Sequence, residues 1–102
     1  MHIRIANSGA VVENVHDLTR LSVHAAAEDS PQNIDASLQQ SRLGLLRDEH
    51  ALLDVEELRN RGPADDPTWA TSYRAMVEFA VSRSWSADDG RYLIAHIERE
   101  HP

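Results

Sequence analysis

Residues 67–84 read PTWATSYRAMVEFAVSRS and carry the strongest helical pattern in the chain. Apolar side chains recur there every three or four positions, which places them on one face of a helix. This stripe comprises Trp69, Tyr73, Met76, Val77, Ala80 and Val81. Asp66 or Thr68 is a suitable N-cap, and Pro67 is compatible with the first helical turn. We therefore predict a helix over 67–84.

The next segment, 87–100, is predicted to form a second helix. Ser86 precedes it in the N-cap position, and Asp89 follows three residues later, as in a capping box. Its apolar residues are Tyr92, Leu93, Ile94, Ala95 and Ile97. Only a short turn around Trp85 separates the two segments, so we expect them to form a C-terminal αα-hairpin.

Three further helical segments are predicted upstream of this hairpin. The first begins near Val15 and contains Ala25-Ala26-Ala27, a run with high helix propensity. The second starts at Ser30-Pro31, an N-cap followed by proline, and continues past Gly44, where we expect a bend.

The third upstream segment runs from Leu45 to Arg61, and Asp54 with Glu57 forms a possible internal capping box. Gly62-Pro63 ends this segment in the order usual for a helix terminus. Residues 62–67 are interpreted as an internal linker.

The N-terminal residues 1–13 are predicted to form a short extended arm. His2-Ile3-Arg4-Ile5 alternates polar and apolar residues, and Asn7-Ser8-Gly9 is a plausible turn before Ala10-Val11-Val12. Whether these residues form a strand pair is left open. Together these patterns predict an all-α fold, a small bundle of four to five helices in a single helical domain spanning 1–102.

Charge and composition exclude several classes of function. The chain has ten arginines, no lysine and 17 acidic residues, which gives a net charge of −7. Such a surface repels phosphate backbones and anionic lipid, so we expect no nucleic acid or membrane partner and favour a basic protein. The absence of cysteine excludes disulfides, thiol nucleophiles and cysteine-based zinc sites. No long apolar run or signal-peptide core is present, so we predict a cytoplasmic location.

The preferred functional hypothesis is a small protein–protein interaction module or accessory subunit. Trp85 lies at the tip of the predicted hairpin, where an exposed tryptophan would be a typical interface anchor. The acidic residues Asp65, Asp66, Asp88 and Asp89 would complement a basic partner. The alternative for Trp85 is a hydrophobic plug beneath the turn. We expect no catalysis by the chain alone and no cofactor, because its glycines are scattered and no Gly-x-Ser-x-Gly motif occurs.

The alternative hypothesis is a homodimeric helical bundle that binds a metal or a small ligand. Two Glu-x-x-His spacings occur, Glu13 with His16 and Glu98 with His101. On a helix, residues three apart share a face, which is how di-iron carboxylate bundles present two ligands from one helix. Both motifs lie near predicted segment ends, and six histidines among 17 acids produce such spacings readily by chance.

Overall fold

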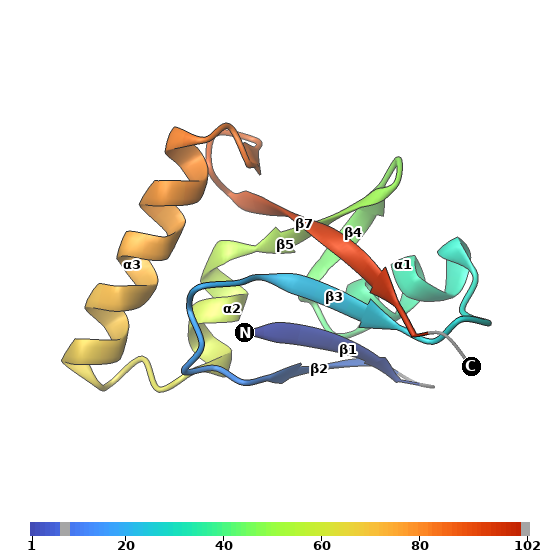
Figure 1. Ribbon diagram of the computed structural model, residues 1–102, viewed down its shortest axis with the longest axis horizontal. Coiled ribbons are helices and arrows are strands. Elements are labelled where there is room, and N and C mark those ends of the chain that lie inside the picture. Colours follow the sequence, from blue (N-terminus) through green and yellow to red (C-terminus); the bar gives the residue numbers. More distant parts are fainter. Residues whose placement is uncertain (7–8, 101–102) are drawn as a thin grey trace.

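The computed structural model describes residues 1–6 and 9–100 and shows a mixed α/β protein (Figure 1). Helices and strands each occupy 34% of the described residues, so the predicted all-α bundle is wrong. The strands are β1 (His2–Ala6), β2 (Gly9–Glu13), β3 (Ser22–Ala25), β4 (Gly44–Arg47), β5 (His50–Asp54), β6 (Ser86–Ala87) and β7 (Tyr92–Arg99). The helices are α1 (Pro31–Gln40), α2 (Val55–Arg61) and α3 (Pro67–Ser82).

The described strands form one curled sheet in the order β2-β1-β3-β7-β5-β4, with β6 pairing to β7 beside this path. The two outer pairs, β1–β2 and β4–β5, are antiparallel hairpins. Strand β3 runs parallel to both β1 and β7. Strand β7 joins the two halves, because residues 92–95 pair with β5 whereas residues 96–99 pair with β3. Residues far apart in the chain therefore meet at the centre of the sheet.

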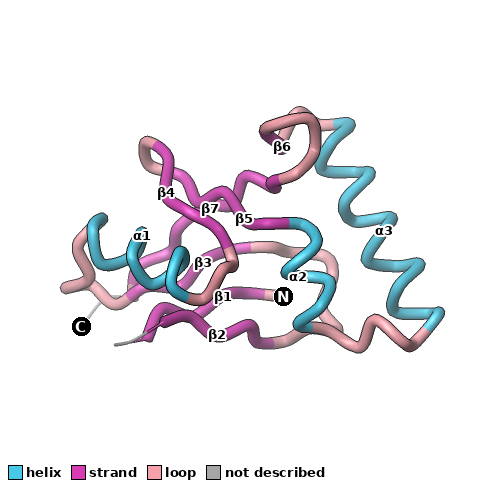
Figure 2. Tube along the Cα trace, turned by 180° about the vertical axis from the view of Figure 1, so that it is seen from behind, coloured by secondary structure: helices cyan, strands magenta, loops and turns pink. Residues whose placement is uncertain are grey.

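Helix α1 lies against both edge strands of the curled sheet, at the end of the molecule opposite to α3 (Figures 1 and 2). The main-chain nitrogen of Ala10 on β2 donates to the hydroxyl of Ser41, which follows α1, over 2.7 Å. The nitrogen of Leu46 on β4 donates to a carboxylate oxygen of Asp35 over 2.8 Å. These side chains satisfy edge groups that would otherwise be open to pairing with another chain.

The core fills the space between the sheet and the helices. Its largest fully buried side chains come from strands, from α1 and α2, and from the turn between α1 and β4: Ile3, Val23, Ile34, Leu38, Leu43, Leu53, Leu58 and Leu93. Trp69 and Tyr73 of α3 extend it, with their rings stacked at 5.0 Å. The Tyr73 hydroxyl donates to the Val55 carbonyl over 2.6 Å, and burial raises the pKa of Tyr73 above its usual value.

The predicted C-terminal αα-hairpin is wrong in its second half. Residues 87–100 contain the end of β6 and all of β7, which pairs with a strand on each side. Tyr92, Leu93 and Ala95 are all buried, so apolar residues occupy both faces of the strand. A strand buried on both faces loses the alternation that identifies a strand in the sequence.

Two upstream helices are also wrong, for related reasons. Ala25-Ala26-Ala27 has high helix propensity, but Ser22–Ala25 forms β3 between β1 and β7, so tertiary pairing overrides local preference. Residues 44–54 form the hairpin β4–β5, and only Val55–Arg61 is helical in that region. Leu52 and Leu53 are both buried, again on opposite faces of one strand.

Several local predictions are confirmed. Residues 2–6 and 9–13 are extended and pair as a hairpin. Ser30, Asp54 and Asp66 cap α1, α2 and α3, and each accepts a main-chain N–H from the first turn. Gly62 follows the end of α2, where an added Cβ would lie 2.3 Å from the Trp69 ring.

Helices α1 and α3 both end in a Schellman motif that lacks glycine. After α3, Ser84 has a φ of 63°, Trp85 N donates to Ala80 O over 2.8 Å, and Ser84 N donates to Val81 O. After α1, Arg42 has a φ of 60° and Leu43 N donates to Leu38 O over 3.0 Å. Because these positive-φ residues are not glycine, no glycine marks either helix end in the sequence; the helix predicted over 67–84 ends two residues earlier, at Ser82, and the one predicted to continue past Gly44 ends at Gln40.

We expect Ser84→Gly to raise the free energy of unfolding by about 1 kcal/mol, because glycine adopts a positive φ without steric cost. Ser82→Gly is the matched control: inside the last helical turn it should lower stability by roughly 0.5–1 kcal/mol. Urea unfolding followed by circular dichroism measures both. Destabilisation by both substitutions would contradict the left-handed conformation at Ser84.

Candidate functional site

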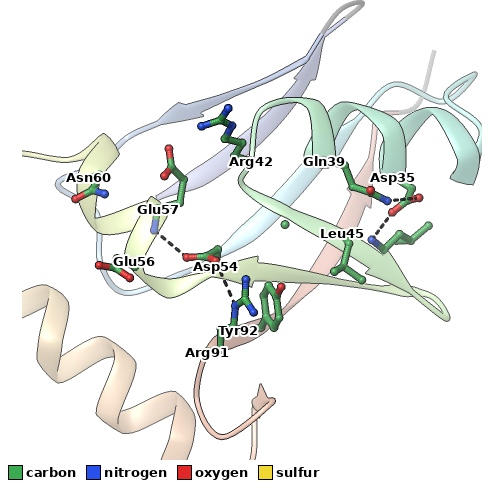
Figure 3. Close-up of a pocket in the computed structure, with 12 residues that line it drawn as sticks. Asp35, Gln39, Arg42, Leu45, Asp54, Glu56, Glu57, Asn60, Arg91 and Tyr92 are labelled. Carbon is green, nitrogen blue, oxygen red and sulfur yellow. Dashed lines mark hydrogen bonds and ion pairs between the residues drawn. The ribbon is translucent and has the colours of Figure 1, made fainter.

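A polar hollow of about 590 Å³ lies between α1, β4, β5 and α2 (Figure 3). Three of its carboxylates, Asp35, Asp54 and Glu57, already bind other groups of the chain. Asp35 accepts from Leu46 N and from the Gln39 amide, and Asp54 accepts from Glu57 N and lies 3.8 Å from the Arg91 guanidinium. These contacts cap α2 and tie α1 to β4, so the hollow is a structural junction.

A histidine cluster lies on the sheet face opposite the core. The imidazole rings of His2 and His24 stack at 4.3 Å, with 6° between their planes. His2 Nε2 lies 2.8 Å from Glu13, and His24 Nε2 lies 3.2 Å from Glu98. The hydrogen bond from His2, assisted by the nearby charge of Arg4, lowers the pKa of the Glu13 carboxyl.

This cluster lacks the geometry of a nucleophilic triad. Ser22 Oγ lies 3.0 Å from His24 Nε2, which is the same nitrogen that faces Glu98. A triad needs the nucleophile on one ring nitrogen and the orienting carboxylate on the other. The contacts instead cross-link strands β2, β1, β3 and β7.

The glutamates of the predicted metal motifs do not lie on helices. Glu13 and Glu98 lie on strands rather than helices, so the expected helical face is wrong. Each glutamate instead contacts a histidine from another part of the chain, His2 or His24. His16 lies in the 14–21 segment, and His101 lies outside the described residues. In the part of the chain that the structure describes, no three histidine, aspartate or glutamate side chains are placed to hold a metal ion.

An apolar groove of about 670 Å³ lies between α3 and residues 16–21. Its lining side chains are His16, Leu18, Thr19, Arg20, Leu21, Ser72, Ala75, Met76, Phe79, Ala80, Trp85, Leu93 and Ile94. One wall is the side of α3 that carries Ser72, Ala75, Met76, Phe79 and Ala80, and the other wall is the 16–21 segment. We call this feature the α3 groove.

Hydrogen bonds hold both walls of the α3 groove in place. The Trp69 indole nitrogen donates to Val15 O over 2.7 Å, which attaches the 16–21 segment to α3. The main-chain nitrogen of Met1 lies 3.1 Å from Arg20 O. The Asp17 carboxylate accepts from the hydroxyl and the main-chain nitrogen of Thr19 over 2.6 and 3.2 Å.

An exposed aromatic cluster borders the groove where α3 ends. Trp85 is 52% exposed and Phe79 is 51% exposed, and their rings meet edge to face at 5.9 Å. The Arg83 guanidinium lies over the Phe79 ring, 5.1 Å from its centre. Trp85 is therefore not a buried plug. Its contact with Phe79 is the apolar contact that accompanies a Schellman motif, so part of its role is to end the helix.

Both main-chain polar groups of Trp85, the N–H and the carbonyl, form hydrogen bonds. Its nitrogen donates to Ala80 O over 2.8 Å, and its carbonyl accepts from Ile94 N over 2.9 Å. The side chain thus projects from a rigid support, which lowers the entropy cost of using it in an interface.

The four predicted acidic residues fall into two separate pairs. Asp65 and Asp66 precede α3, and Asp66 caps it by accepting from Thr68 N and Trp69 N. Asp88 and Asp89 lie in the turn between β6 and β7, and Asp88 is 3.9 Å from Arg47. The 16 residues of α3, about 24 Å of helix, lie between the pairs. Only Asp88 and Asp89 are close in the chain to the aromatic cluster.

Sequence reasoning missed the wall formed by residues 16–21, because it assigned Leu18 and Leu21 to a helix. It also placed Val81 on the buried stripe, although that side chain is 45% exposed. The sequence did contain an indication of the exposed aromatic cluster at Phe79, a large apolar residue outside the predicted stripe of α3. An aromatic residue outside the core-facing stripe indicates exposure.

Comparisons of this chain with protein-family models, with curated proteins and with solved structures find no match. Among the described residues, the helices are too short or too polar to cross a bilayer.

Proposed function

We propose that the chain is a protein–protein interaction module that binds a larger or basic partner through the aromatic cluster of Phe79 and Trp85. The observation that carries this proposal is an exposed tryptophan on a rigid backbone beside another exposed aromatic ring and a groove. Tryptophan and other aromatic side chains dominate the binding energy of interfaces. Contiguous exposed apolar surface is typical of interaction sites on soluble proteins.

Charge supports a basic partner in this proposal. A net charge of −7 increases the rate at which a positively charged protein associates. Asp88 and Asp89 adjoin the aromatic cluster in the chain and extend the proposed surface. A role of Asp65 and Asp66 in binding the partner remains a prediction. It requires a partner that extends along the whole of α3, from the aromatic cluster to the first turn of the helix.

The test compares complexes that co-purify with the tagged chain from its own host, observed by native mass spectrometry. We expect an additional polypeptide bound to the wild-type chain, and at least a tenfold weaker complex with Trp85→Ala, as is usual for an interface anchor. Because Trp85 is half exposed, its removal should lower the free energy of unfolding by only about 1 kcal/mol.

Val11→Ala is the matched control, since Val11 is 48% exposed on the edge strand β2, away from the cluster. It should retain the partner. Equal retention by Trp85→Ala and Val11→Ala would contradict the proposal, as would loss of the folded state in Trp85→Ala. The same spectra report a homodimer directly from its mass.

A further inference from the structure

We propose that the α3 groove is also a binding site for a small amphipathic carboxylate, a ligand with an apolar chain and one anionic end group, such as a medium-chain fatty acid. This inference does not depend on the proposed partner, although Phe79 and Trp85 border both surfaces.

The first argument is the size and lining of the groove. Its volume of about 670 Å³ lies within the range of natural small-molecule sites, about 300–1,000 Å³. Nine of its thirteen lining residues are apolar, including Met76 and Phe79 of α3 and Leu93 and Ile94 of β7. Such sites typically combine an apolar wall with a few polar groups that orient the ligand.

The second argument is the local sign of the charge. The whole chain carries −7, yet the only ionisable side chains that line this groove are His16 and Arg20, and no carboxylate lines it. The polar residues that complete the lining are Ser72 and Thr19, and the Thr19 hydroxyl already donates to Asp17 over 2.6 Å. The groove is thus complementary to an anion on a protein that otherwise repels anions.

The third argument is that the Arg20 guanidinium is available. Among the described residues it has no carboxylate oxygen within 4.0 Å. The Asp17 carboxylate accepts two hydrogen bonds from Thr19, and these bonds, with smaller contributions from the charges of the N-terminus and Arg20, lower its pKa. A guanidinium binds a carboxylate in a two-pronged arrangement that adds orientation to affinity. The ligand would therefore place its carboxylate at Arg20 and its chain along Met76 and Phe79.

The test is a titration with decanoate, kept below its micelle concentration and followed by amide chemical shifts of the ¹⁵N-labelled protein. We expect saturable shifts confined to residues 16–21, to the groove side of α3 and to Trp85. Decanol, with the same apolar chain and no charge, should bind at the same place at least about tenfold more weakly, and decylamine more weakly still.

Two variants separate the charge from the cavity. Arg20→Gln should weaken decanoate about tenfold and leave decanol unchanged, whereas Arg74→Gln, on α3 but outside the lining, should change neither. Ala75→Trp fills the groove and should abolish binding of both probes, with an otherwise unchanged amide spectrum. Equal affinity for decanoate and decylamine, insensitivity to Arg20→Gln, or shifts elsewhere on the protein would overturn the proposal. Partner capture is measured separately, so failure of either proposal can be recognised by itself.

Discussion

Gly44→Ala is expected to lower the free energy of unfolding by about 3 kcal/mol or more. A Cβ at this position would lie 1.9 Å from the Leu52 carbonyl oxygen and 2.9 Å from its carbonyl carbon. Both are main-chain atoms of β5, so the clash cannot be relieved by rotating a side chain. The hairpin β4–β5 would have to separate where Gly44 pairs with Leu53, and Leu53 is fully buried.

This substitution also distinguishes the observed fold from the helical interpretation of the same residues. If Gly44 were inside a helix, alanine would stabilise the protein by about 1 kcal/mol, which is a change of opposite sign. Guanidinium unfolding followed by circular dichroism and tryptophan fluorescence measures the difference. Gly90→Ala is the control: its added Cβ would approach only Val81, at 3.9 Å, and the φ of 86° should cost about 1–2 kcal/mol. Stability of Gly44→Ala at or above the wild-type value would contradict the close approach of β4 and β5.

Trp69→Ala is expected to have the second large effect, a loss of about 3–5 kcal/mol. The side chain is 4% exposed and stacks on Tyr73, and it packs against Gly62 at the end of α2. Helix α3 lies at one end of the molecule, so Trp69 and Tyr73 provide much of its attachment to the core (Figure 2). Loss of this ring would also release Val15 and with it the 16–21 wall of the α3 groove.

Trp69→Phe separates the two roles of this residue. Phenylalanine retains most of the apolar packing but lacks the indole N–H, so Val15 O loses its donor at a cost of about 1–3 kcal/mol. We therefore expect Trp69→Phe to lie between wild type and Trp69→Ala in urea unfolding, with amide shift changes concentrated at residues 14–21. A Trp69→Ala variant as stable as Trp69→Phe would contradict a packing role for the ring.

Helix starts and the alternation of β1 could be predicted from the sequence, because they depend on interactions between residues close in the chain. Ser30, Asp54 and Asp66 each bind a main-chain N–H two or three residues ahead, so the start of every described helix could be predicted from its own neighbourhood. The alternation in residues 2–5 similarly reflects one buried and one polar face of β1. The ends of α1 and α3 were harder to predict from the sequence, because Arg42 and Ser84 occupy positions where glycine usually marks a helix end.

The candidate site was predicted only in part. Trp85 was identified as a potential anchor, and its exposure agrees with that role. The 16–21 segment was not identified, because it becomes a wall only when Trp69, 54 residues away from Val15, donates its indole proton. The pairing of Glu13 with His2 and of Glu98 with His24 likewise depends on strand register rather than on the Glu-x-x-His spacing.

Local patterns in the chain predicted the start of each described helix, the acidic surface and the amphipathic character of α3, because caps, charges and helical stripes depend on residues within a few positions of one another. The same patterns also predicted false helix starts near Val15, Leu45 and Ser86, and it is long-range pairing that makes residues 22–25, 44–47, 50–54 and 92–99 strands. Strand β7 is stabilised by hydrogen bonds to β3 and β5, which lie more than 35 residues away in the chain. Because these strands are buried on both faces or short, their apolar residues fit a helical spacing equally well, and pairing with distant segments selects the strand.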